Sequence, residues 1–231
     1  MEIHGGHDVI AQPLGSFKEK TSTYSLLLIF YQEFPLILPY SIFLLTSTLP
    51  QKSMRRIMTL KTYENVLDFW FGPKSSPGYL KQKSFWYGSP SDDALVRKEL
   101  GESYEAAKEG TLDTWTQAGE GEGALALILL LDQVPRNIFR NSPQAYATDD
   151  KAISVSRYAV EQGWDKALPT IQRRYLYSPF NHSENLADQE LSVKLFTGLG
   201  DPYHLHWAKD FRDQIKRNGR FVHRDSILGR S

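Results

Sequence analysis

The segment from Ala124 to Leu131 reads ALALILLL and is apolar on every side. A surface helix carries only an apolar stripe, so a helix that is apolar all round belongs in the centre of a bundle. The segment runs into Asp132-Gln133-Val134-Pro135, and a proline removes one helical hydrogen bond, so the helix should kink or end there. The sequence therefore predicts a central helix enclosed by others, with polar residues at its far end.

Helical patterns fill the rest of the sequence from about residue 62 onward. Glycine follows several of them, as it commonly does at helix ends. No long run alternates apolar and polar residues as a half-buried strand does, and no repeat of fixed period is evident. The predicted helices lie at 62–72, at 91–108 with Ser91 as the cap, at 111–118, at 149–161, at 164–177, at 181–198 and at 202–218. We predict an all-α array of packed antiparallel helices.

The first part of the sequence, residues 1–57, differs in composition from the all-α domain expected at 58–231. We treat it as an irregular N-terminal extension. Within it, the segment 24–49 is apolar apart from Glu33, and it is long enough for a membrane span of roughly 20 residues. Pro35 interrupts its middle. We therefore expect contact with a membrane only through residues 24–49, if this segment is a true transmembrane anchor.

Two other interpretations of the extension remain open. Met54 and Met58 both precede the first clear helix, so the upstream residues could come from a wrong start codon. A short transit peptide beginning at Met54 is the other alternative. A cleaved signal peptide is disfavoured because the apolar region starts late and no small-residue cleavage site stands out. We predict a cytoplasmic protein, with membrane or mitochondrial location as the alternatives.

Composition narrows the possible chemistry. Lysine plus arginine and aspartate plus glutamate both number 27, so there is no basic excess to attract nucleic acid, and we expect none to bind. The sequence has no cysteine, which excludes disulfides, thiolate metal sites and cysteine nucleophiles. We predict no cofactor and no metal site.

The first polar cluster is LDQVPRNIFR, residues 131–140. Asp132 follows the apolar helix, and Arg136 and Arg140 continue at four-residue steps if the kink is mild. A charge at the end of a buried helix needs a partner, so Asp132 and Arg136 should pair. Either the pair only ties helices together, or Arg136 or Arg140 holds an anion in a pocket.

The second cluster is SPFNHSENLADQ, residues 178–189. Asn181 and Glu184 have the spacing of a capping box, so Glu184 is interpreted as a cap residue. His182 and Gln189 then lie in line with the apolar stripe of the helix. His182 would sit at the helix start, where the dipole disfavours its cation. It is either a satisfied core histidine or a group for acid–base work.

The third cluster is RNGRFVHRDSILGR, residues 217–230. It contains four arginines and His223. A solvated basic tail is the simplest interpretation, but Phe221, Ile227 and Leu228 interleave with the charges and would pack the segment onto the domain.

Four ordered segments together resemble the signature of the domain of unknown function 924 family. They are VLDFWFG (66–72), LLDQVPRNIFR (130–140), YLYSPFNHSENLADQ (175–189) and GRFVHRDSILGR (219–230). The family is uncharacterised and is similar in architecture to tetratricopeptide-like helical proteins, which agrees with the all-α prediction. The resemblance brings no activity with it, only a fold and candidate site positions.

By that resemblance, a set of polar residues falls on motif positions. They are Asp132, Gln133, Arg136, Asn137, Arg140, His182, Ser183, Glu184, Gln189, Arg220, His223, Arg224, Gly229 and Arg230. The sequence also departs from the family pattern. Phe211 stands where the family usually has histidine, and Asn218, Val222 and Asp225 replace other motif residues. The family pattern continues past the LGR segment with a further acidic, helical stretch, whereas this sequence ends at Ser231.

Three functions from different classes follow from these clusters. The first is a helical domain that binds a small anionic ligand or a peptide in a cleft shared by Arg136, Arg140, His182 and either Arg220 or Arg224. Gln133, Asn137, Gln189, His223 and Arg230 are further candidates for ligand contacts. The second is an enzyme, a hydrolase or acid–base catalyst that uses His182 with Glu184 or Asp132. The third is a helical interaction domain tethered to a membrane through 24–49.

Overall fold

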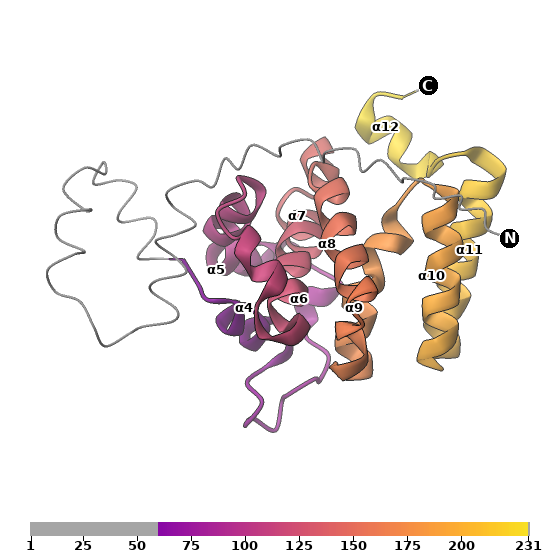
Figure 1. Cartoon of the computed structure of the whole chain (residues 1–231). Helices are drawn as coiled ribbons and strands as arrows, with labels where there is room; N and C mark the ends of the chain where they lie inside the picture. Colours follow the sequence, from indigo (N-terminus) through magenta and orange to yellow (C-terminus); the bar gives the residue numbers. More distant parts are fainter. Residues whose placement is uncertain (1–59, 231) are drawn as a thin grey trace, which may run out of the picture.

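The computed structural model describes residues 60–230, and this part of the chain is built from helices joined by short turns (Figure 1). Its α-helices are α4 (Tyr63–Phe71), α5 (Pro90–Lys108), α6 (Glu122–Ile128), α7 (Val134–Ile138), α8 (Asp149–Glu161), α9 (Thr170–His182), α10 (Leu186–Leu199), α11 (Pro202–Asn218) and α12 (Asp225–Leu228). Short 3-10 turns lie between them, and no strand occurs in the described range. The prediction of an all-α array is confirmed. The likeness of this array to tetratricopeptide proteins stays a prediction.

The central helix is α6, as the apolar segment predicts. Every residue from Ala124 to Leu131 is fully buried. The helices α4, α8 and α9 all pack against α6, so its apolar surface contacts other helices on every side. Figure 1 shows α6 inside the array, with the α10–α11 pair following α9 at one end.

The helix does not end at Pro135. It widens instead into a π-helical turn at Leu129–Gln133, and α7 then continues to Ile138. Because a proline has no N–H to donate and its ring crowds the preceding turn, a wider turn lets the chain pass without a break. Asp132 lies in this turn, and π-helical turns are frequent at functional sites.

The start of α5 differs from the prediction by two residues. Ser89, not Ser91, is the cap: its Oγ accepts a hydrogen bond from the backbone N–H of Asp92 at 3.3 Å, and Pro90 is the first helical residue. A residue before proline is restricted to the extended backbone that a cap requires, and Ser89 has φ −134° and ψ 168°. Pro90 therefore favours Ser89 as the cap of α5.

The predicted boundary between α9 and α10 is wrong. The helix expected at 181–198 begins only at Leu186, capped by Asn185, because α9 continues through Pro179 to His182. Pro179 cannot donate to the Tyr175 carbonyl, but Ser178 Oγ donates to that oxygen at 2.8 Å. The hydroxyl has one proton, which it shares between this carbonyl and a second acceptor, so the carbonyl that proline leaves free is compensated in part and the helix continues.

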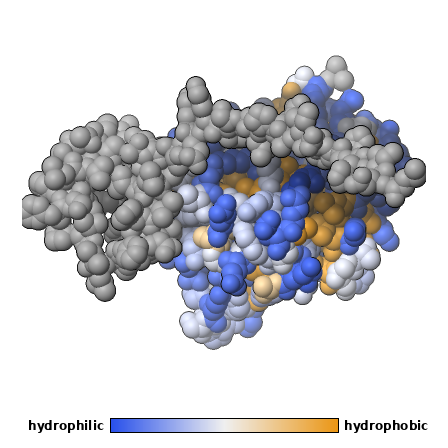
Figure 2. Space-filling view, in the orientation of Figure 1, coloured by the Kyte–Doolittle hydropathy of each residue, from blue (hydrophilic) through white to orange (hydrophobic). Residues whose placement is uncertain are grey.

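Apolar side chains become exposed at the surface toward the α10–α11 end of the array. In Figure 2 the visible face is mostly hydrophilic, and apolar residues reach the surface beside α10. On α11, Tyr203 is 63% exposed and Trp207 is 40% exposed. Charged and polar side chains that are buried instead gather near α8, α9 and the C-terminal turns, where the candidate site lies.

The predictions made for the N-terminal extension lie outside the described residues. These are the extension 1–57 itself, the candidate anchor 24–49 and the alternative start codon at Met58. Between residues 60 and 230, no helix is both long enough and apolar enough to span a membrane.

Candidate functional site

Asp132 is the centre of a buried polar cluster. Its side chain is fully buried in the π-helical turn. One carboxylate oxygen, Oδ1, accepts a hydrogen bond from His182 Nδ1 at 2.7 Å and lies 3.1 Å from Arg136 Nη1. The other, Oδ2, accepts from Ser178 Oγ at 2.7 Å and from Gln133 Nε2. Both oxygens are thus satisfied, as a buried charge requires.

The surroundings of Asp132 keep it ionised. Burial on its own raises the pKa of a carboxyl group. The positive charges of Arg136 and His182, together with the hydrogen bonds from His182 and Ser178, outweigh burial and hold the pKa of Asp132 well below its ordinary value. An ionised carboxylate only accepts hydrogen bonds, so the proton shared with His182 belongs to Nδ1 of the imidazole.

Arg136 joins Asp132 to a second carboxylate, that of Asp149. Its Nη1 and Nη2 each donate to one oxygen of Asp149 at 2.9 Å, and Nη1 also donates to the backbone carbonyl of Asp132 at 2.6 Å. Burial lowers the pKa of Arg136, but the two aspartates more than compensate, and the net pKa is raised. The predicted Asp132–Arg136 pair therefore exists as part of a larger ionic cluster.

Arg224 approaches the same cluster from the C-terminal turn Val222–Arg224. Its Nη2 donates to the carbonyl oxygen of His182 at 3.0 Å. Its guanidinium carbon lies 4.6 Å from the centres of both the Tyr146 and the Phe221 rings. The residue is only 6% exposed. These contacts fix the position of the arginine without supplying a full negative charge.

The charge of Arg224 is incompletely neutralised. Its nearest carboxylate oxygen is Asp149 Oδ2, at 3.5 Å from Nη1, and Asp149 is already bound by Arg136. The Nε atom is buried without a hydrogen-bond partner in the described part of the chain. Burial, followed by repulsion from Arg136, lowers the pKa of Arg224 below its ordinary value. A negatively charged ligand would relieve this imbalance.

His182 is the last residue of α9, so its predicted place at a helix start is wrong. The dipole argument for a neutral ring, which depended on that place, does not apply. While Nδ1 is bound to Asp132, Nε2 makes no hydrogen bond to any residue in the range 60–230, and the side chain is 24% exposed. The ring is thus oriented by a buried carboxylate, and its second nitrogen has no hydrogen-bond partner in that range.

A pocket of about 190 Å³ lies where α8, α9 and the C-terminal turn meet. His182 and Arg224 both line it. The complete lining consists of Tyr146, Asp149, Asp150, Ile153, Pro179, His182, Ser183, Glu184 and Arg224. This volume lies below the roughly 300–1,000 Å³ of pockets for drug-sized ligands, so the pocket suits a small molecule.

Glu184 is not the helix cap that the sequence suggests. Its carboxylate accepts two hydrogen bonds from Arg230, at 2.6 and 2.9 Å, and one from the backbone N–H of Phe221 at 2.9 Å. These contacts hold the C-terminal segment against the turn between α9 and α10. The Arg230 hydrogen bond is the largest cause of a lowered pKa at Glu184. Glu184 therefore positions the segment that carries Arg224.

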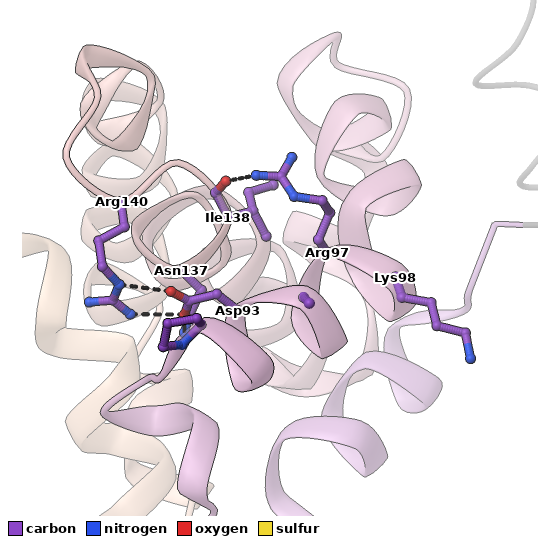
Figure 3. A pocket seen from close by; sticks show the side chains of 8 residues that line it. Asp93, Arg97, Lys98, Asn137, Ile138 and Arg140 are labelled. Carbon is purple, nitrogen blue, oxygen red and sulfur yellow. Dashed lines mark hydrogen bonds and ion pairs between the residues drawn. The ribbon is translucent and has the colours of Figure 1, made fainter.

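Arg140 and Asn137 lie away from the pocket at His182, so Arg140 does not share the predicted cleft. Figure 3 shows both side chains directed to Asp93 of α5. Arg140 binds Asp93 with two hydrogen bonds, at 2.8 and 2.9 Å, and Asn137 Nδ2 donates to Asp93 Oδ1 at 3.0 Å. Arg140 points outward because it follows the end of α7, where the helical spacing from Arg136 no longer holds.

The remaining candidates have local roles. Gln189 is fully buried, and its Nε2 donates to the carbonyls of Phe180, Asn181 and Ser183, which fixes the turn after α9. Arg220 pairs with Asp225 at 2.9 Å, and His223 is exposed. The arginine that faces the pocket is therefore Arg224 rather than Arg220.

Sequence reasoning did not single out several residues of the site. Asp149 and Asp150 were recognised only as part of a predicted helix, and Tyr146 and Ser178 were given no role. Asp149 is the first residue of α8, where acidic residues are favoured for helical reasons alone, so its sequence position gives no sign of the bond to Arg136. The only available signal for Ser178 was its place just before Pro179.

The fold and the site together define a small all-α domain with a buried aspartate–histidine pair beside a partly compensated arginine. The chain belongs to the family described as bacterial protein of unknown function (DUF924), which matches residues 66–231. It is similar to the solved structure of a protein of unknown function from Agrobacterium tumefaciens. That similarity has a TM-score of 0.64 and 37% sequence identity, and covers 73% of this chain and 90% of that chain. None of the curated proteins compared with the chain matches it.

Proposed function

We propose that the domain binds a small anionic molecule, a carboxylate or a phosphate, in the pocket between α8, α9 and the C-terminal turn. The observation that carries this proposal is Arg224, which is almost fully buried and whose one ion pair within the described range, with Asp149 at 3.5 Å, is to a carboxylate already bound by Arg136. The nearby arginines Arg136 and Arg230 are already paired within the domain. Arg224 is thus the pocket residue with attraction left for an anion, and its Nη1 makes no hydrogen bond to a residue in the described range.

His182 supplies the second polar contact of the proposed site. His182 and Arg224 line the same pocket, His182 Nε2 makes no hydrogen bond within the described range, and Arg224 Nη2 donates to the carbonyl of His182. An oxyanion bound by Arg224 can therefore also lie within reach of the imidazole. The small volume of the pocket favours a small molecule over a folded peptide segment.

Binding can be tested by thermal unfolding of the full chain with propanoate, succinate and inorganic phosphate. A ligand at about 100 times its Kd stabilises the folded state by about 2.7 kcal/mol, which raises the Tm by roughly 5–10 °C for a domain of this size. We expect at least one probe to do so. Arg224→Met should abolish the rise, because it removes the charge and keeps an apolar side chain between the two rings.

Arg140→Met is the matched control, because Arg140 is 46% exposed and is bound to Asp93 outside the pocket. It should leave the ligand-dependent rise in Tm unchanged. The proposal is wrong if no small carboxylate or phosphate stabilises the protein, or if both arginine variants lose the effect equally.

The aspartate–histidine pair favours a second candidate function, acid–base catalysis on the bound molecule. A carboxylate that holds Nδ1–H fixes the tautomer of the imidazole, leaves Nε2 to exchange a proton and stabilises the protonated ring. Asp132 has this position at 2.7 Å, whereas the other proposed partner, Glu184, is engaged by Arg230 and the Phe221 backbone. His182 would be the proton-transfer group, and Asp132 its positioning residue.

Nitrogen NMR of histidine-labelled protein tests this arrangement without a known substrate. In the unprotonated ring of His182, we expect the proton on Nδ1 and a bare Nε2. Asp132→Asn, with an amide that can also donate, should weaken or reverse this preference, and His223, which is exposed and makes no such pair, provides an internal reference. A proton on Nε2 in the wild-type protein would contradict the catalytic arrangement.

A further inference from the structure

The pocket contains three carboxylates, and they differ in what they already bind. Asp149 is bound through both oxygens by Arg136 and is approached by Arg224. Glu184 is bound through both oxygens by Arg230. These two carboxylates are therefore committed to holding the site together and have little attraction left for a ligand.

Asp150 is the exception among the acidic residues of the pocket. Its carboxylate makes no ion pair or hydrogen bond within the described range; only its backbone carbonyl is used, by Ser154 Oγ at 2.8 Å. It lines the same pocket as Arg224 and His182. The side chain is exposed, so it is hydrated and stands at the rim of the pocket rather than in its interior.

The groups that are free to bind a ligand therefore carry opposite charges. Arg224 is positive and buried, and its Nη1 has only the 3.5 Å ion pair with Asp149, while His182 Nε2 makes no hydrogen bond within the described range. Asp150 is negative and exposed. A purely anionic ligand would be attracted by the first two groups and repelled by the third, whereas a molecule with both charges would satisfy all three.

From this distribution of free groups, we propose that the ligand is a small zwitterion, an amino acid or a similar aminocarboxylate. Its carboxylate binds Arg224 and His182, and its ammonium group binds Asp150. The inference rests on the proposed function and adds the class of ligand to it. Asp150 is exposed and the N-terminal dipole of α8 acts against a cation there, so the ammonium contact should improve binding by only about two- to fivefold.

The test is isothermal titration of the full chain with matched probes. Alanine is compared with propanoate, and 4-aminobutanoate with butanoate, because each pair differs in its amino group. Propylamine serves as the probe without a carboxylate. We expect at least one aminocarboxylate to bind about two- to fivefold more tightly than its matched carboxylate, and propylamine not to bind measurably.

Asp150→Asn should remove this preference and leave the affinity for the simple carboxylate unchanged or slightly higher. The control Asp113→Asn removes an exposed carboxylate that is paired with Lys151 outside the pocket and should change neither affinity. If the matched carboxylates bind as well as the aminocarboxylates, the zwitterion inference is wrong while anion binding stands. If no probe binds, or if Arg224→Met leaves binding intact, the proposed function fails as well.

Discussion

Replacement of Asp132 by alanine is expected to lower the free energy of unfolding by about 3–5 kcal/mol, the usual cost of removing one partner from a buried ion pair. Asp132 is fully buried, and its loss leaves Arg136 with Asp149 alone and removes the acceptor of His182. Ser178 and Gln133 lose the same acceptor. Urea denaturation followed by circular dichroism measures the change.

A double-mutant cycle separates the pair from the rest of the cluster. Arg136→Ala should also be strongly destabilising, and the double variant should cost less than the sum of the two single variants, because one buried charge no longer remains unpaired. Arg140→Ala, at the exposed pair with Asp93, should cost at most about 1 kcal/mol. Strict additivity of Asp132→Ala and Arg136→Ala would show that the two side chains do not interact.

Arg136→Met and Arg224→Met should differ strongly in their cost to stability, although both arginines belong to one cluster. Asp132 and Asp149 raise the pKa of Arg136 despite its burial, so its charge is stabilised by folding. Burial and Arg136 lower the pKa of Arg224, so its charge is disfavoured in the folded protein. We expect Arg136→Met to cost about 3–5 kcal/mol and Arg224→Met less than about 1 kcal/mol, because replacing a poorly compensated buried charge by an apolar residue is often neutral.

The difference in stability between these two variants tests whether the charge of Arg224 serves the fold or a ligand. If Arg224→Met folds with nearly full stability but no longer binds a carboxylate or phosphate, its charge serves the ligand rather than the fold. Truncating a buried charge that binds a ligand typically costs about 2–5 kcal/mol of affinity, a loss of at least about thirtyfold. A destabilisation as large as that of Arg136→Met would instead assign Arg224 to the structural ion-pair network.

The fold class, the family and several helix bounds could be predicted from local residue patterns. The helices α8 and α11 have the predicted bounds, because acidic residues start the first, Asp201 and Pro202 start the second, and Gly219 ends it. The completely apolar segment 124–131 also predicted correctly that α6 lies at the centre of the array. Such features depend on spacing and capping over a few residues, which are contained in the sequence.

The errors arose where a side-chain contact overrides the helix end or cap that the neighbouring residues predict. The helix predicted at 164–177 was expected to end before Pro179, but α9 continues through the proline to His182, and Ser178 Oγ donates to the Tyr175 carbonyl. That extension moves His182 from a helix start to a helix end. Glu184 was interpreted as a cap because its spacing fits one, and it binds Arg230 instead.

What the sequence by itself determined is that a charge at the end of the apolar helix, Asp132, requires a partner, and that polar residues cluster at 131–140, 178–189 and 217–230. Which partners they have was decided only by the tertiary structure. The packing of α8 against α9 and of the C-terminal turn near both brings Asp149 to Arg136 and Arg224, whereas the packing of α5 against α7 brings Asp93 to Arg140. Charges on separate helices interact through distance and burial, and neither quantity can be obtained from their separation along the chain.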